Sequence, residues 1–266
     1  MKWVLNTYQT GQELSAERLI ELCAATGYDG IEWLMDFNQP HGIEARAPKE
    51  HVRAVLEKAR AAGLESVSFT SCAHFHERDP ERHAENLDRA RRTIALAAEF
   101  GVPNVRVLGD RVPHDDPAER ERVLRQVTDS LRELGELAAA HGIDLSLEMH
   151  GSFADPDLAI PVIEAVAMPN VGVVFNCQWR RSEPYFWGVP EGASIRPLYE
   201  RFRRHLKMIH THQMERPEEL PHYRELFALL KADGWDGIVC QEAAYRGPDP
   251  EKVLALYTAL FRLLTA

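Results

Sequence analysis

The chain has 266 residues, of which 45% are hydrophobic and 27% charged, and its formal net charge is −10. This length supplies a sizeable core, and α/β barrels routinely reach it as a single domain. The acidic balance argues against a nucleic-acid-binding protein, because affinity for phosphates comes largely from Lys and Arg. The sequence shows neither a secretory signal nor a membrane-spanning run, so we expect a cytoplasmic protein that does not contact a membrane.

Eight short apolar runs follow one another along the chain, and polar loops and stretches with helical spacing separate them. The runs cover residues 2–6, 30–34, 66–70, 104–109, 144–149, 171–176, 207–212 and 237–242. Between them, apolar residues recur at three- and four-residue spacing, as at Val52, Val55, Leu56 and Ala59, which is typical of an amphipathic helix. The sequence therefore predicts that strands and helices alternate over the whole chain.

Capping residues support this division into elements. Asp79, Asp116 and Asp249 each precede a proline, and this pair is typical of a helix N-terminus. Asp155 before Pro156 indicates a further, shorter helix. No linker rich in Gly, Ser or Pro divides the chain, and no glycine-rich phosphate loop follows the first strand. The sequence thus predicts an α/β protein, a single-domain (β/α)8 TIM barrel over residues 1–266.

Histidines are concentrated where such a barrel performs its chemistry, at the ends of the strands and in the loops that follow. Eight of the twelve fall there: His41, His74, His76, His114, His150, His210, His212 and His222. In the segment MIHTHQME, residues 208–215, strand alternation places His210 and His212 on the same face. The simplest alternative is a hydrogen-bonded core histidine and a second one at the strand end.

Two glutamates occupy the ends of predicted strands, Glu148 on the fifth and Glu242 on the eighth. A carboxylate at this position is costly unless it is paired or coordinates a metal ion. One of them could form a salt bridge with Arg106 on the neighbouring strand. If both glutamates face His210 across the barrel, the three side chains would form a site for one divalent ion, Mn²⁺, Mg²⁺, Co²⁺ or Zn²⁺.

The loop after the sixth strand carries Trp179, Tyr185, Phe186 and Trp187. Aromatic rings stack on the C–H faces of sugars, and a long loop can close over a site. Trp179 and Trp187 are therefore candidate substrate contacts. A contact between the subunits of a homo-oligomer is an equally simple use of the same loop.

Five segments resemble, in their order and spacing, the sugar phosphate isomerase/epimerase family of xylose isomerase-like TIM barrels in the AP endonuclease 2 superfamily. They are GYDGIEW (27–33), LAAEFGVPNVRVLG (96–109), LSLEMHG (145–151), KMIHTHQ (207–213) and GWDGIVCQE (234–242). The resemblance covers nearly the whole chain. By position in members similar to ketose 3-epimerases, it implies that Glu148, Asn176, His210 and Glu242 hold one divalent metal ion.

The sixth strand departs from the family pattern, which has Asp followed three residues later by His. This chain has Asn176 and Trp179 instead. An amide oxygen can bind a hard cation but adds no charge, so the metal ion would be held more weakly.

The resemblance also implies substrate contacts. His212 stands where many members carry Lys, and Arg216 follows His210 at a spacing where epimerase-like members carry an arginine; a solvated loop charge is the alternative for Arg216. His74 and His150, beside the ends of their strands, are further candidates for substrate binding.

The resemblance implies an isomerase or epimerase that acts on a small polyhydroxy carbonyl compound. Glu148 and Glu242 would move the proton of the carbon beside the carbonyl, through an enediolate. A lyase that dehydrates a keto-sugar or an inosose, with His150 or His212 as the acid, is one alternative. A non-catalytic sugar-binding barrel, which Asn176 favours, is another.

An apurinic-site endonuclease shares the barrel, but its zinc site needs Asp and His on the sixth strand and Asp-x-His after the seventh. This chain has neither pattern. Nucleic acid is therefore not an expected partner.

Overall fold

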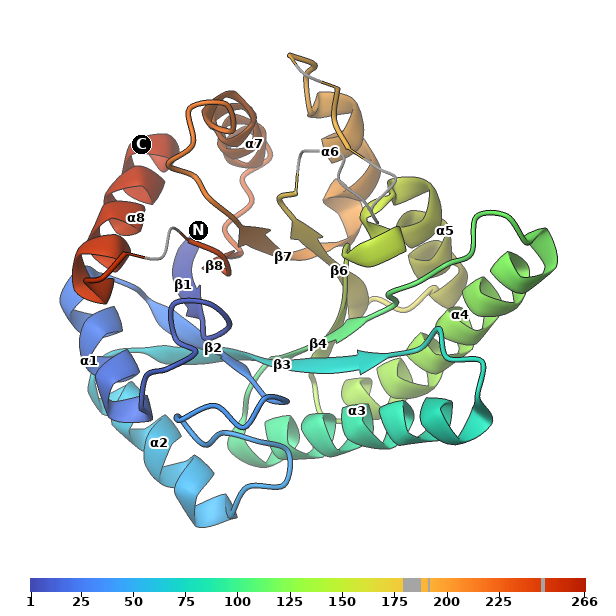
Figure 1. Ribbon diagram of the computed structural model, residues 1–266, viewed down its shortest axis with the longest axis horizontal. Helices are drawn as coiled ribbons and strands as arrows, with labels where there is room; N and C mark the ends of the chain where they lie inside the picture. The colour runs from blue at the N-terminus through green and yellow to red at the C-terminus, as the bar shows by residue number, and fades with distance from the viewer. Residues whose placement is uncertain (179–187, 191, 245–246) are drawn as a thin grey trace.

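The computed structural model describes residues 1–178, 188–190, 192–244 and 247–266. Eight parallel strands pair in chain order, and β8 pairs with β1 to close a barrel that the helices surround (Figure 1). The strands are β1 (Lys2–Asn6), β2 (Gly30–Leu34), β3 (Glu65–His74), β4 (Asn104–Leu108), β5 (Asp144–Glu148), β6 (Val171–Asn176), β7 (Leu206–Thr211) and β8 (Ile238–Gln241). The predicted (β/α)8 TIM barrel is confirmed.

One α-helix follows each strand. The helices are α1 (Ala16–Thr26), α2 (Lys49–Ala61), α3 (Pro80–Phe100), α4 (Pro117–Ala139), α5 (Pro156–Val166), α6 (Arg196–Phe202), α7 (Leu220–Ala232) and α8 (Pro250–Thr265). Two short 3₁₀ helices, η1 (Gly151–Ala154) and η2 (Arg203–His205), precede α5 and β7.

The predicted caps begin the helices as expected. The side chains of Asp79, Asp116 and Asp249 accept hydrogen bonds from backbone N–H groups in the first turns of α3, α4 and α8. Asp155 caps α5 in the same way. These bonds satisfy N–H groups that have no partner within the helix, and so fix where each loop ends.

Strand ends agree with the sequence-based ranges to within a residue or two, except in β3. The expected strand ended at residue 70, whereas β3 continues to His74 across an irregular stretch of its pairing with β4. His74 is therefore the last residue of a strand. Strand β8 ends at Gln241, so Glu242 lies one residue beyond the strand.

Side chains fill the barrel in layers. One layer holds an apolar cluster of buried residues: Val4, Val67, Val174, Met208 and Cys240. In its polar part, Asn104 donates to Ser68 Oγ at 2.9 Å and accepts from Ser146 Oγ at 2.5 Å. Because strand side chains alternate, the next inward position on each strand lies two residues further along. That next layer is polar.

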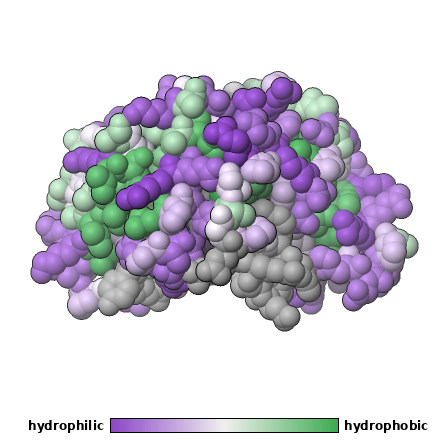
Figure 2. Space-filling model, turned by 90° about the horizontal axis from the view of Figure 1, so that it is seen from above, coloured by the Kyte–Doolittle hydropathy of each residue, from purple (hydrophilic) through white to green (hydrophobic). Residues whose placement is uncertain are grey.

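No helix within the described ranges combines the length and apolar character that crossing a membrane requires. Figure 2 shows hydrophilic residues distributed between smaller hydrophobic patches on one face of the molecule.

Candidate active site

The polar layer at the C-terminal ends of the strands contains three carboxylates, two amides, one guanidinium and one imidazole. Its members are Asn6, Glu32, Arg106, Glu148, Asn176, His210 and Glu242, and none is more than 7% exposed. Buried charges are costly unless each has a partner of opposite charge. The contacts within this layer therefore determine what the site can do.

His210 occupies the middle of the layer. Its Nε2 lies 2.9 Å from Glu32 Oε2, and its Nδ1 lies 3.4 Å from Glu242 Oε1 and 3.8 Å from Glu148 Oε1. Burial lowers the pKa of His210, but the charges of Glu32 and Glu242 outweigh burial and hold the pKa well above its ordinary value. The sequence-based expectation that His210 faces both glutamates is confirmed.

Glu32, on β2, anchors the far side of this imidazole. It accepts hydrogen bonds from Asn6 Nδ2 at 2.8 Å, from Cys240 Sγ at 3.0 Å and from Thr70 Oγ1. Burial raises the pKa of Glu32, but His210 and Thr70 together lower it to about 2. Sequence reasoning missed this residue, although a single charge inside the apolar run GIEWL was a usable signal.

Arg106, on β4, supplies the permanent positive charge of the layer. Its Nε lies 2.8 Å from Glu148 Oε2, and one terminal nitrogen lies 3.9 Å from Glu242 Oε1. Its other terminal nitrogen donates to the carbonyl of Ser71 at 3.0 Å. Burial raises the pKa of Glu148, but Arg106 and His210 together outweigh it and lower the pKa below its usual value. The salt bridge considered for Arg106 from the sequence is therefore present.

Asn176 lies between the two glutamates, but its amide is oriented differently from a metal ligand. Nδ2 donates to Glu148 Oε1 at 2.5 Å and to Glu242 Oε2 at 3.4 Å. Oδ1 faces His212 Nε2 at 2.5 Å. Coordination through the amide oxygen would require a half-turn of the amide, which would then present its NH₂ group to His212.

His212 connects this buried layer to the outside. Its side chain is 23% exposed, and Nε2 lies 3.3 Å from Glu242 Oε2. His210 on β7 and His212, one residue beyond its end, therefore point to the same side, as predicted, and both reach Glu242. His212 does so from the more exposed side.

The donor atoms fit a divalent cation. One ligand atom from each of Glu148, His210 and Glu242 lies within 4.8 Å of the others. Among the described residues, His210 Nδ1 and Glu148 Oε2 are buried without a well-aligned hydrogen-bond partner. Glu32, His210 and Cys240 form a second such group. There, burial raises the pKa of the Cys240 thiol well above its usual value, so that sulfur donates a hydrogen bond instead of binding as a thiolate.

The other candidate residues lie away from this layer. His74 and His150 are half-buried at the ends of β3 and β5, where they belong to a separate group of polar side chains. Arg216 is exposed after β7, in keeping with the solvated loop charge considered above. Trp179 and Trp187 lie outside the described residues.

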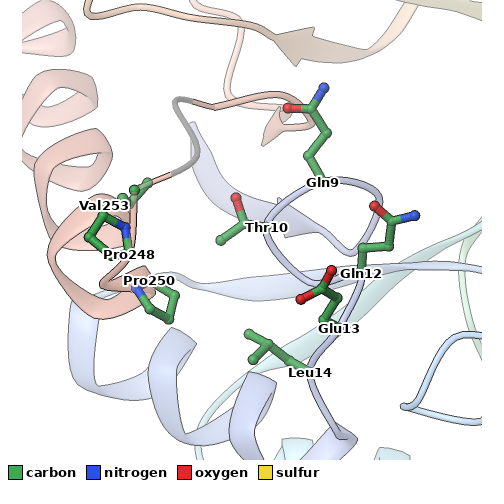
Figure 3. A pocket seen from close by; sticks show the side chains of 9 residues that line it. Gln9, Thr10, Gln12, Glu13, Leu14, Pro248, Pro250 and Val253 are labelled. Atoms are coloured by element: carbon green, nitrogen blue, oxygen red, sulfur yellow. The ribbon is translucent and has the colours of Figure 1, made fainter.

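A further pocket of about 400 Å³ lies between the loop after β1 and the start of α8 (Figure 3). The described part of its lining consists of amides, one hydroxyl, prolines and apolar side chains, and Glu13 is the one ionisable residue in that part. This lining does not provide the paired charges found inside the barrel.

A (β/α)8 barrel with buried carboxylates and an imidazole at the C-terminal ends of its strands has the form of an enzyme of this fold. Residues 20–260 match the family model described as a xylose isomerase-like TIM barrel. The chain belongs to this family, as its sequence segments indicated.

Curated relatives include an inosose isomerase from Bacillus velezensis, 24% identical over 181 residues, an alignment that covers 66% of this chain and 62% of the relative. The chain thus spans less than two thirds of that protein's length.

Solved structures share the fold over nearly the whole chain. A 3-keto-D-glucoside 4-epimerase from E. coli has a TM-score of 0.76 at 19% identity, over 99% of this chain and 98% of the other. An IOLI protein with a bound zinc atom has a TM-score of 0.70 at 18% identity, and the match covers 100% of this chain and 96% of the other. A xylose isomerase-like TIM barrel protein from Mycobacterium smegmatis in complex with magnesium has a TM-score of 0.71 at 20% identity, and the match covers 99% of this chain and 96% of the other.

Glu32→Gln should lower the free energy of unfolding by about 3–5 kcal/mol at pH 7, because it removes the carboxylate that lies nearest to the buried His210 imidazolium. The pKa of Glu32 is about 2 in the folded protein, against an ordinary value of 4.5. The stabilising effect of the carboxylate is therefore complete above pH 4.5 and is lost as the pH falls toward 2. The difference between wild type and mutant should narrow over that window.

Urea unfolding at a series of pH values measures this difference. Glu65→Gln is the matched control, because Glu65 forms an exposed ion pair with Lys2 and should cost less than about 1 kcal/mol. A loss for Glu32→Gln as small as that of the control would show that the His210 contact does not stabilise the fold.

Proposed function

We propose that this protein is a divalent-metal-dependent isomerase or epimerase that acts on a small polyhydroxy carbonyl compound, of the inosose or keto-sugar class. The observation that carries the proposal is the convergence of Glu148, Glu242 and the Nδ1 atom of His210 inside the barrel. Two carboxylates beside a third donor allow one group to remove a proton and another to return it. The inosose isomerase and epimerase relatives support this reaction class.

The residues that would hold the metal ion are Glu148, His210 and Glu242, with Asn176 as a fourth ligand after rotation of its amide. When bound, a divalent ion supplies Lewis acidity to the carbonyl oxygen and to the charge that develops on the enediolate. Neighbours of the same fold hold zinc or magnesium. Glu32 orients the ligand, because a carboxylate at Nε2 favours the tautomer whose Nδ1 lone pair points toward Glu148 and Glu242.

Glu148 and Glu242 would act on the carbon next to the carbonyl. The pKa values of both carboxyls lie below their usual value despite their burial, so both are ionised and able to accept a proton at neutral pH. Arg106 stabilises this state of Glu148. His212, half-exposed and 3.3 Å from Glu242, would exchange the transferred proton with solvent.

Glu148→Gln should keep the fold and reduce the exchange of solvent deuterium into the substrate by about 10²- to 10⁴-fold, which is the usual effect of a general acid or base. The measurement is proton NMR in D₂O with ketoses, inososes and 3-keto-glycosides as candidate substrates. Glu136→Gln, an exposed position on α4, is the control.

Wild-type exchange in the Glu148→Gln variant would remove Glu148 from the reaction. Loss of water from a substrate instead of exchange would assign the protein to the dehydratase alternative.

The two histidines of β7 should have separable roles. His210→Gln should abolish stoichiometric binding of Mn²⁺, because it removes the Nδ1 ligand, while His212→Gln should retain the ion and mainly weaken substrate binding. Metal analysis after dialysis, with calorimetry of Mn²⁺ binding, distinguishes the two. Equal loss of metal in both variants would show that the roles are assigned wrongly.

Asn176→Asp tests the departure from the family pattern. It replaces an amide that donates to Glu148 and Glu242 with a third carboxylate, so the metal-free protein should lose stability through like-charge repulsion. Metal affinity should rise, and turnover should stay unchanged or fall, because a more neutralised cation is a weaker Lewis acid. Thermal melting and calorimetry with and without Mn²⁺ measure these effects.

Asn38→Asp, at an exposed position, controls for the added charge. A metal affinity unchanged by Asn176→Asp, or a wild type that binds no divalent ion, would favour the non-catalytic sugar-binding barrel.

A further inference from the structure

A second group of histidines and carboxylates lies beside the ends of β3, β4 and β5. We call it the β3–β5 cluster, and it consists of His74, His76, Glu77, Asp110 and His150. Strands β7 and β8, which place His210 and Glu242, lie on the opposite side of the closed barrel (Figure 1). Arg106 and Glu148 of the site proposed above stand on β4 and β5, the strands that Asp110 and His150 follow, but no residue belongs to both groups.

The first three members converge on one point. One ligand atom from each of His74, His76 and Glu77 lies within 4.8 Å of the other two. The rings of His74 and His76 stack with their centroids 4.9 Å apart. His74 Nδ1 lies 3.1 Å from the carbonyl of Cys72, to which it donates, and this bond directs its Nε2 toward Glu77 Oε1, 3.1 Å away. A backbone carbonyl at one ring nitrogen is the usual way to orient a metal-binding histidine.

Asp110 approaches the same point from the end of β4. Its Oδ2 lies 3.9 Å from His76 Nδ1, and its Oδ1 lies 3.9 Å from His150 Nδ1. These separations are too long for hydrogen bonds. His76 Nδ1 is buried and has no hydrogen-bond partner among the described residues.

Asp110 adopts an uncommon backbone conformation. Asp110 has a φ of +67°, a conformation that side chains other than glycine rarely adopt. Its carbonyl accepts from Ser152 N at 2.9 Å, and a Cβ added to Gly151 would lie 2.9 Å from Asp110 Oδ1. Strained residues held by close packing are found preferentially at binding sites.

The separations suit a transition-metal ion. Two ligands that each lie about 2.0–2.1 Å from a tetrahedral zinc ion are roughly 3.4 Å apart. The nitrogen-to-oxygen distances here, 3.1 Å and 3.9 Å, lie on either side of that value. Two carboxylates balance the charge of the ion, and imidazoles favour Zn²⁺ over Mg²⁺.

We infer that His74, His76 and Glu77, with Asp110 in reach, form a second metal site that binds Zn²⁺ in preference to Mg²⁺. A pocket of about 880 Å³, lined by His76, Glu77, Asp110 and His150, opens over the cluster. It gives the ion a path of entry and leaves room for water or an oxygen of a ligand at a remaining coordination position. Arg78 and Arg111 line the same pocket and suit an anionic ligand.

This inference does not rest on the proposed isomerase activity. The alternative is a His74 imidazolium that pairs with Glu77 without any metal ion. Zinc content distinguishes the two, because an ion pair binds no metal.

The test is to strip the full chain of metal and titrate it with Zn²⁺ against a chromophoric chelator. His76→Gln and, separately, Glu77→Gln should each lose one equivalent of tightly bound zinc relative to wild type. His141→Gln, an exposed histidine in the turn after α4, should lose none. His210→Gln should keep the equivalent of zinc that His76→Gln loses. The test of the β3–β5 cluster is therefore valid even if the site at His210 binds no ion.

A crystal of the zinc-loaded protein should show an anomalous peak at the zinc edge between His74, His76 and Glu77. Thermal melting establishes that the variants are folded. A zinc stoichiometry in both cluster variants equal to that of wild type, or an anomalous map without a peak at this position, would overturn the inference and leave the cluster as an ion pair.

Discussion

The position of His210 between carboxylates from three other parts of the barrel governs the arrangement of charge inside it. Glu32 on β2, Glu148 on β5 and Glu242 after β8 all lie within 3.8 Å of one of its ring nitrogens. Metal binding at Nδ1 would release a proton from His210, and Arg106 would then face three carboxylates, so the layer would carry two more negative than positive charges. An interior with this excess is stabilised by any further cation that enters it. The same contacts that hold four strands together therefore favour metal binding.

Much of the fold could be predicted from local patterns. Apolar runs of strand length, aspartates before prolines and the order of the segments were sufficient to predict eight β/α units, because these signals depend on neighbouring residues only. The end of β3 was not predictable in the same way. Its last residues pair with β4 only across an irregular stretch that ends at His74 and Leu108, and such pairing depends on the register of a distant strand.

The candidate site was predictable in part for the same reason. Alternation along β7 places His210 and His212 together, and the barrel brings Glu148 and Glu242 to them. The orientation of the Asn176 amide depends on three side chains from β5, β7 and the segment after β8, which local sequence does not specify. Glu32 was missed because a lone charge in a strand has no partner in the sequence. Its partner lies 178 residues away, at His210.

The apolar layer on the N-terminal side of the site affects the route by which protons and ligands reach the site. Val4, Val67, Val174, Met208 and Cys240 are at most 1% exposed, and the polar groups beside them bond to one another. Together they fill the barrel on the N-terminal side of the polar layer. In the proposed reaction, the protons that the carboxylates take up or release and the substrate itself would therefore enter from the C-terminal ends of the strands. A ligand that fills this end of the barrel would leave His212 as the contact between the carboxylates and bulk water, so the rate at which a removed proton is replaced by a solvent proton would depend on His212.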